Sequence, residues 1–121
     1  MSAWAWLGVA LLGGIGANAR FLTHTLVAAR FGEQLPLGTL IINASGSLLL
    51  GLLAGLALSG EALVLAGTAT LGSYTTFSTW MLDTHRLVEG GRRGPAILNV
   101  AVSLALGLGA VALGQLVGRG F

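Results

Sequence analysis

The charged residues of this chain are spaced so that four long stretches contain none of them. The stretches free of Asp, Glu, Lys and Arg are residues 1–19, 34–60, 62–82 and 94–118. A helix that crosses a bilayer needs about 20 mostly apolar residues. We therefore expect an all-α integral membrane protein, a four-helix bundle in one domain over 1–121. The expected spans are residues 3–29, 37–58, 62–82 and 95–117.

The connections between these spans are expected to be short, with one exception. Ser59, Gly60 and Glu61 leave room only for a tight turn, whereas the polar segment from Asp83 to Gly94 is expected to be the one substantial loop. No basic residue precedes the first apolar stretch, and three more such stretches follow it. We therefore expect a first span rather than a cleaved signal peptide.

Composition excludes several functional classes. Apolar residues make up 55% of the 121 positions, so little chain remains outside the lipid for a catalytic or nucleotide-binding domain. The six arginines are dispersed, unlike the basic patch of a nucleic-acid-binding protein. With no cysteine and two histidines, the side chains offer no metal cage. No acid–base pair stands inside the spans, so we expect no enzyme.

Small and polar residues recur every four positions in the second span. They are Thr39, Asn43, Ser47, Gly51, Gly55 and Ser59. Residues four apart share one face of a helix, and membrane helices associate through small side chains and polar contacts. This face is therefore a packing seam or, because the Asn43 amide offers two donors and one acceptor, a wall of a polar path. Asn99, Ser103 and Gly107 give the fourth span the same two interpretations.

The third span is unusually rich in glycine and hydroxyl groups. Ten of the thirteen residues from Gly67 to Thr79 are of these kinds. Glycine and threonine are weak helix formers, and irregular backbone at membrane depth must be covered by protein or line a water-filled cavity. We expect a buried, broken helix, whose free carbonyls suit a hard cation and whose half-helix amino end attracts anions. The alternative is a Ser/Thr-rich packing face.

Arg20 is the one charge well inside an expected span, and the carboxylates are placed differently. An intramembrane arginine is a functional candidate by default, so Arg20 is either a cation in a vestibule or an anchor that snorkels to the interface. The four carboxylates, Glu33, Glu61, Asp83 and Glu89, fall in expected loops or at span ends. A proton-coupled exporter needs a titratable carboxylate within its spans. The sequence therefore favours a passive ion channel over a small multidrug or cation exporter.

Three blocks of sequence, in this order and spacing, resemble the Fluc (CrcB) fluoride channel family. The blocks are GGIGANAR at 13–20, GTLIINASG at 38–46 and GSYTTFSTW at 72–80. The likeness extends over essentially the whole chain. It implies a four-helix protein of the bacterial inner membrane that pairs as an antiparallel, dual-topology dimer. Such a dimer exports fluoride passively through two pores and holds a structural sodium ion at its centre.

The resemblance also implies roles for particular residues. Asn43 would line the pore, the ring edge of Phe77 would face fluoride, and Ser78 and Thr79 would offer pore hydroxyls. Gly72 and Thr75 would bind sodium through backbone carbonyls.

Two positions depart from the family's pattern. Trp80 stands where the second aromatic ring is usually phenylalanine, and Asn99 stands where a tyrosine is usual, followed by Ser103 as in the pattern.

The arginines are unevenly distributed between the two ends of the expected spans. Arg30, Arg86, Arg92 and Arg93 fall on one side and Arg119 on the other. The positive-inside rule then favours both termini outside, whereas an ideal dual-topology chain would be balanced. The expected partner is a second copy in an antiparallel homodimer or, as the alternative, a paired homologous subunit.

Overall fold

The computed structural model describes all 121 residues, and they fold into helices joined by short connections. The three long helices are α1 (Ala3–Phe31), α2 (Leu37–Gly55) and α6 (Arg93–Arg119). Between α2 and α6 the chain forms α3 (Gly60–Leu63), the π-helix η1 (Val64–Leu71), α4 (Gly72–Tyr74) and α5 (Ser78–Glu89). The structure contains no strand, so the predicted all-α class is confirmed.

Each of the three long helices is long and apolar enough to cross a membrane. The shortest, α2, has 19 residues, which at about 1.5 Å per residue extend for about 28 Å, close to the thickness of a bilayer's hydrocarbon core. The prediction of an integral membrane protein with several apolar spans is therefore confirmed. The segment 60–89 consists of shorter helices, and none of them reaches that length alone.

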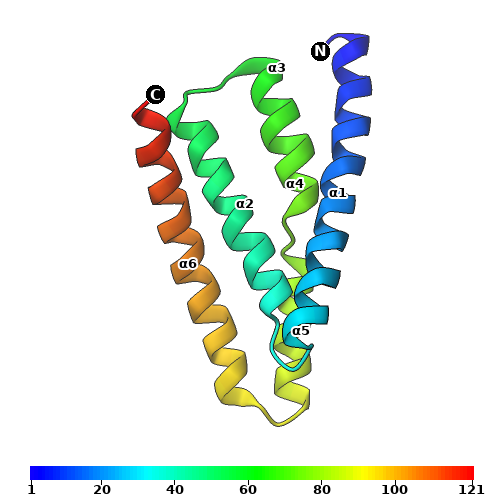
Figure 1. Cartoon of the computed structure of the whole chain (residues 1–121), viewed down its shortest axis with the longest axis vertical. Helices are drawn as coiled ribbons and strands as arrows, with labels where there is room; N and C mark the ends of the chain where they lie inside the picture. Colours follow the sequence, from blue (N-terminus) through cyan, green and yellow to red (C-terminus); the bar gives the residue numbers. More distant parts are fainter.

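The helices form an open array rather than a closed bundle (Figure 1). The chain descends through α1, ascends through α2, descends through α3 to α5 and ascends through α6, so both termini lie at one end. In this view α6 and α1 stand at opposite edges with α2 between them. Only 14 of the 121 residues are buried, so nearly every helix has a broad face that this chain alone does not cover.

Glycines bring α2 and α6 into backbone contact. A Cβ on Gly51 would stand 2.3 Å from the carbonyl oxygen of Val111, and one on Gly114 would stand 2.2 Å from that of Leu48. Gly55 and Gly118 repeat the arrangement one turn further along. Because membrane helices gain contact by close backbone approach, the glycine half of the stripe in α2 is a packing seam.

The segment 60–89 changes its neighbours along its length. Its first part, η1 and α4, packs on α1, where a Cβ on Gly16 would collide with the carbonyl oxygen of Thr70. Its last part, α5, packs on α6 instead. The irregular residues 75–77 lie between these two parts and allow the change of partner (Figure 1).

The prediction of a loop from Asp83 to Gly94 was wrong. Helix α5 continues to Glu89, and only Gly90, Gly91 and Arg92 connect it to α6. Asp83, Arg86 and Glu89 belong to this amphipathic helix, which buries Leu87. His85 and Glu89, one turn apart, pair at 2.8 Å on its outer face.

The turn between the second and third expected spans is longer than predicted. Helix α2 ends at Gly55, and Ala57 adopts a left-handed conformation with φ of 57° before α3 begins at Gly60.

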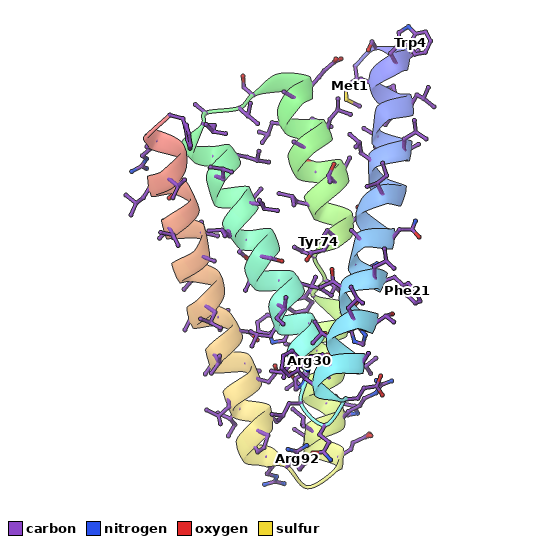
Figure 2. All side chains as sticks on the ribbon, viewed as in Figure 1. Met1, Trp4, Phe21, Arg30, Tyr74 and Arg92 are labelled. Carbon is purple, nitrogen blue, oxygen red and sulfur yellow. The ribbon has the colours of Figure 1, made fainter.

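Most basic residues gather at the end of the array opposite the termini. Arg30 and Arg92 lie at that end, and Met1 and Trp4 lie at the other (Figure 2). The Arg92 guanidinium donates to the carbonyl of Gln34 at 2.7 Å and thereby ties the two connecting loops together.

Candidate functional site

The backbone leaves the helical path between α4 and α5. Thr75 makes the last regular helical bond, donating to the carbonyl of Leu71 at 2.9 Å, and is itself extended, with φ of −80° and ψ of 162°. Helix α5 begins again at Ser78. A break of this kind leaves backbone groups without helical partners, and in a membrane-spanning chain those groups must be paired by other means.

The side chain of Asn43 pairs with the broken backbone. Its Nδ2 donates to the carbonyl oxygen of Thr76 at 2.8 Å, and its Oδ1 accepts the Thr76 N–H at 2.9 Å. This double hydrogen bond, the Asn43 clamp, joins the middle of α2 to the break. One N–H of the amide remains outside the clamp, because an asparagine amide carries two donors.

A glycine in α2 makes room for the break beside the clamp. A Cβ on Gly46 would stand 2.2 Å from Cγ2 of Thr75. Asn43 and Gly46 therefore receive the irregular backbone, whereas Gly51 and Gly55 of the same helix pack on α6.

Hydroxyl groups organise the start of α5. Thr76 Oγ1 accepts the backbone N–H of Thr79 at 3.2 Å, as a helix-capping side chain does. The same hydroxyl lies 3.2 Å from Thr79 Oγ1 and 3.5 Å from Ser78 Oγ. The amino end of a helix carries a partial positive charge, so this hydroxyl cluster adjoins an electropositive end.

Two aromatic rings flank the beginning of α5. The rings of Phe77 and Trp80 meet edge to face, with centroids 5.8 Å apart and planes at 86°. Phe77 is 69% exposed, as are many large apolar residues of this chain. The rim of an aromatic ring is electropositive, so an exposed ring edge is a weak donor to an anion.

Two hollows lie on either side of the clamp. A groove of about 710 Å³ is lined by Asn43, Gly72, Thr75, Phe77 and Trp80 among others, and a cavity of about 250 Å³ is lined by Arg20, His24, Thr39, Thr76 and Thr79 among others. Thr76 borders both hollows. The two hollows therefore adjoin at Thr76, the residue that Asn43 holds.

A third hollow lies at the arginine-rich end, beside the loop between α1 and α2. Its volume is about 410 Å³, its lining includes Asp83 and Arg92, and it shares His24 with the cavity beside the clamp. These two hollows therefore adjoin at His24. Arg20 is half-buried beside the smaller cavity, and its side chain makes neither an ion pair nor a hydrogen bond within the chain.

The carbonyl groups at the break suit a hard cation. Because the Thr76 N–H turns to Asn43, it does not bond the carbonyl of Gly72, and the carbonyl of Thr75 accepts no backbone hydrogen bond. Gly72 is exposed and Thr75 half-buried. Carbonyl oxygens of an unwound segment are the ligands that sodium takes in membrane proteins, so these two residues fit the ion that the sequence resemblance implies.

The structure brings together most of the residues singled out from the sequence, but not the two in α6. Asn43, Phe77 and Trp80 share the groove, and Thr79 shares the smaller cavity with Arg20. Ser78 is exposed beside them. In α6, Ser103 is half-buried without a hydrogen bond, and Asn99 donates to the hydroxyl of Thr84 at 2.9 Å; neither lines the hollows described above.

Two polar pairings near the break were not predicted from the sequence: Asn43 with Thr76, and Thr39 with Asp83. The importance of Thr76 depends on Asn43, 33 positions earlier, and no local pattern reveals that pairing. Thr39 is almost fully buried and donates to the carboxylate of Asp83 at 2.8 Å, which places this acid among the helices rather than in a loop.

The chain is similar to known proteins over most of its length. Residues 7–115 match the family model described as "CrcB-like protein, Camphor Resistance (CrcB)". A protein named fluoride-specific ion channel FluC 2 from Mycolicibacterium paratuberculosis is 54% identical over 110 residues, which cover 91% of this chain and 90% of that protein.

Two relatives come from a single organism, Symbiobacterium thermophilum. Fluoride-specific ion channel FluC 1 is 44% identical over 122 residues, covering 96% of this chain and 98% of the relative. Fluoride-specific ion channel FluC 2 is also 44% identical, over 113 residues that cover 89% of this chain and 92% of the relative.

Proposed function

This chain belongs to the CrcB-like protein family, and from that premise we propose that it is a fluoride-specific ion channel that lets cytoplasmic fluoride leave the cell passively. The observation that carries the proposal is the Asn43 clamp, which supports a helix break beside two hollows inside an apolar helix array. The chain is a multi-pass membrane protein, and we place it in the bacterial inner membrane.

The donors around the break match the needs of fluoride. A small anion with a tightly held hydration shell crosses a narrow passage only if other donors replace its water. The donors on offer are the remaining N–H of Asn43, the hydroxyls of Ser78 and Thr79, and the ring edge of Phe77. The amino end of α5 adds a favourable field for an anion.

Arg20 would serve as the cation of a vestibule. It is half-buried, has no counter-ion in the chain and borders the cavity that also contains Thr79. A cation in a low-dielectric recess raises the local concentration of anions. We infer that the route from the arginine-rich end through this cavity is one access path to the clamp.

We further infer that segment 60–89 is one membrane crossing, the third of four, broken at 75–77. Its short helices together run the length of the array (Figure 1). The break lets one crossing pack first on α1 and then on α6.

A second subunit would cover what this chain leaves open. Phe77 is largely exposed, Gly72 and Ser78 are exposed, and the groove beside them opens outward. An antiparallel copy would close the groove and bring a second set of Gly72 and Thr75 carbonyls to a sodium ion at the centre. That structural sodium ion would hold the two broken helices together.

The partner is either a second copy or a homologous chain. Arginines are concentrated at one end of the array, which favours one orientation, and Symbiobacterium thermophilum has two relatives, FluC 1 and FluC 2. Reporters fused to the C-terminus decide between the two. Reporter signal on both sides of the membrane supports the homodimer, and signal on one side alone supports the paired subunit.

The competing function is a proton-coupled exporter, and the position of Asp83 is the observation that favours testing it. Asp83 lies among the helices, half-buried and bonded to Thr39, so one carboxylate is placed where a coupled transporter needs it. In liposomes, a channel continues to release fluoride when a protonophore collapses the proton gradient. The Asp83→Asn variant of a channel should also continue to release fluoride. Loss of transport in both conditions would favour the exporter.

Growth in fluoride tests the function in cells. A bacterial strain without its own fluoride export should regain growth in millimolar fluoride when it makes this chain. The Asn43→Ala variant, matched for amount in the membrane, should not restore growth, because the break loses its clamp. Equal growth of cells carrying the native chain and cells carrying no channel gene would contradict the proposal.

A further inference from the structure

Three hydrogen bonds form a closed ring between α5 and α6. The side-chain amide of Asn99 donates to Thr84 Oγ1 at 2.9 Å, and Thr84 Oγ1 donates to the carbonyl of Trp80 at 2.9 Å. The indole Nε1 of Trp80 in turn donates to the backbone carbonyl of Asn99 at 3.4 Å. All three residues are half-buried, so these polar groups have few other partners in an apolar surrounding.

We propose that Asn99 and Thr84 are positioning residues that hold the indole of Trp80 against α6 and thereby fix the aromatic wall of the fluoride path. This inference rests on the proposed channel function. The indole has a single N–H donor, and the ring of hydrogen bonds directs that donor to α6. Trp80 therefore presents its hydrocarbon ring, rather than its N–H, to the groove that it lines.

The position of the indole also sets the position of Phe77. The two rings meet edge to face, and Phe77 makes little other contact because its side chain is 69% exposed. An indole that rotates away from α6 would remove this support. Asn99 then affects the path through Trp80, without lining the hollows around the clamp itself.

The sequence suggested a different role for Asn99, as a polar group in a conduit, and the two roles predict different behaviour. A group that contacts the ion would act directly on it, whatever the orientation of Trp80. A positioning residue would act through Thr84, whose hydroxyl links Asn99 to the Trp80 backbone. Thr84 is therefore the residue to change, because it belongs to the ring of hydrogen bonds but not to the path.

The test uses the fluorescence of Trp80. Trp4 and Trp6 are 81% and 62% exposed near the start of α1, so Trp4→Phe and Trp6→Phe leave Trp80 as the only indole. In this background Thr84→Val removes the hydroxyl and keeps the branched shape, and Thr84→Ser keeps the hydroxyl. Asn99→Ala removes the same hydrogen bond from its other side and provides a second variant if Thr84→Val does not fold.

We expect Thr84→Val and Asn99→Ala to lower the fluorescence anisotropy of Trp80. Both should also slow fluoride efflux from liposomes. Asn99→Ala removes one hydrogen bond of the ring and should slow efflux by about fivefold, and Thr84→Val removes two and should slow it at least as much. Thr84→Ser should restore both readouts. Native anisotropy in Thr84→Val and Asn99→Ala would overturn the inference, and so would equal changes in Thr84→Val and Thr84→Ser. If the native chain releases no fluoride, the proposed function fails, whereas the anisotropy still decides whether these residues position Trp80.

Discussion

Replacing Gly114 by alanine should push α2 and α6 apart. A Cβ at this position would stand 2.2 Å from the carbonyl oxygen of Leu48 and 2.7 Å from the amide nitrogen of Leu52. Both are backbone atoms of α2, so no side-chain rotation relieves the contact. Ordinary contact begins near 3.4 Å, and the two helices must therefore separate by about 1 Å along the seam that Gly51 and Gly118 continue.

The magnitude follows from two opposing effects. Overpacking a close-packed contact costs about 1–3 kcal/mol, and we expect the upper end because two backbones must move. Alanine is a better helix former than glycine by about 1 kcal/mol, which offsets part of that cost. The net loss in the free energy of unfolding for Gly114→Ala should therefore be about 2 kcal/mol.

A second glycine of α6 provides the matched control. Gly109 is on the same helix, and a Cβ there would meet nothing within 4 Å. Gly109→Ala should therefore gain the helix preference alone, about 1 kcal/mol, and differ from Gly114→Ala by about 3 kcal/mol. The assay is unfolding of purified protein in mixed detergent micelles with increasing dodecyl sulfate, followed by circular dichroism. Equal unfolding curves for the two variants would refute the close backbone contact.

Three further predictions concern the break and its surroundings. Asn43→Asp keeps the acceptor for the Thr76 N–H but loses the donors and adds a negative charge, so fluoride efflux from liposomes should stop; native efflux would contradict the donor role. Gly46→Ala, whose Cβ would collide with the methyl group of Thr75, should cost about 1–2 kcal/mol in unfolding free energy and slow efflux, and an unchanged melting temperature would argue against the contact. Arg20→Gln should slow efflux more at low than at high ionic strength, because salt screens the attraction of an anion to the guanidinium; a slowing independent of salt would exclude the electrostatic role.

The membrane architecture was predictable because it depends on local composition. Apolar stretches of about 20 residues without charge are typical of membrane-spanning helices, so the apolar spans could be predicted from the sequence. The glycines of α2 were also visible as a four-residue repeat, since helix geometry places them on one face. The repeat alone did not separate the half that packs on α6 from the half that contains Asn43. That distinction depends on which residues of other helices lie opposite.

The polar contacts at the site were beyond sequence reasoning for the same physical reason. The bonds of Asn43 to Thr76 and of Thr39 to Asp83 join residues 33 and 44 positions apart, and residue spacing within one helix carries no information about them. The polar stretch after Asp83 was mistaken for a loop because its charges were counted without their helical phase. Leu87 is buried on one side of α5, Asp83 faces Thr39, and Arg86 and Glu89 are exposed on the outer face of the helix.

We propose that this polypeptide alone forms a selective, passive path for fluoride. The most direct test is ion efflux from liposomes that contain only the purified chain and are loaded with fluoride or with chloride, followed by ion-selective electrodes. We expect rapid release of fluoride and negligible release of chloride. Release of both ions at similar rates, or no release of fluoride from folded protein, would contradict this proposal.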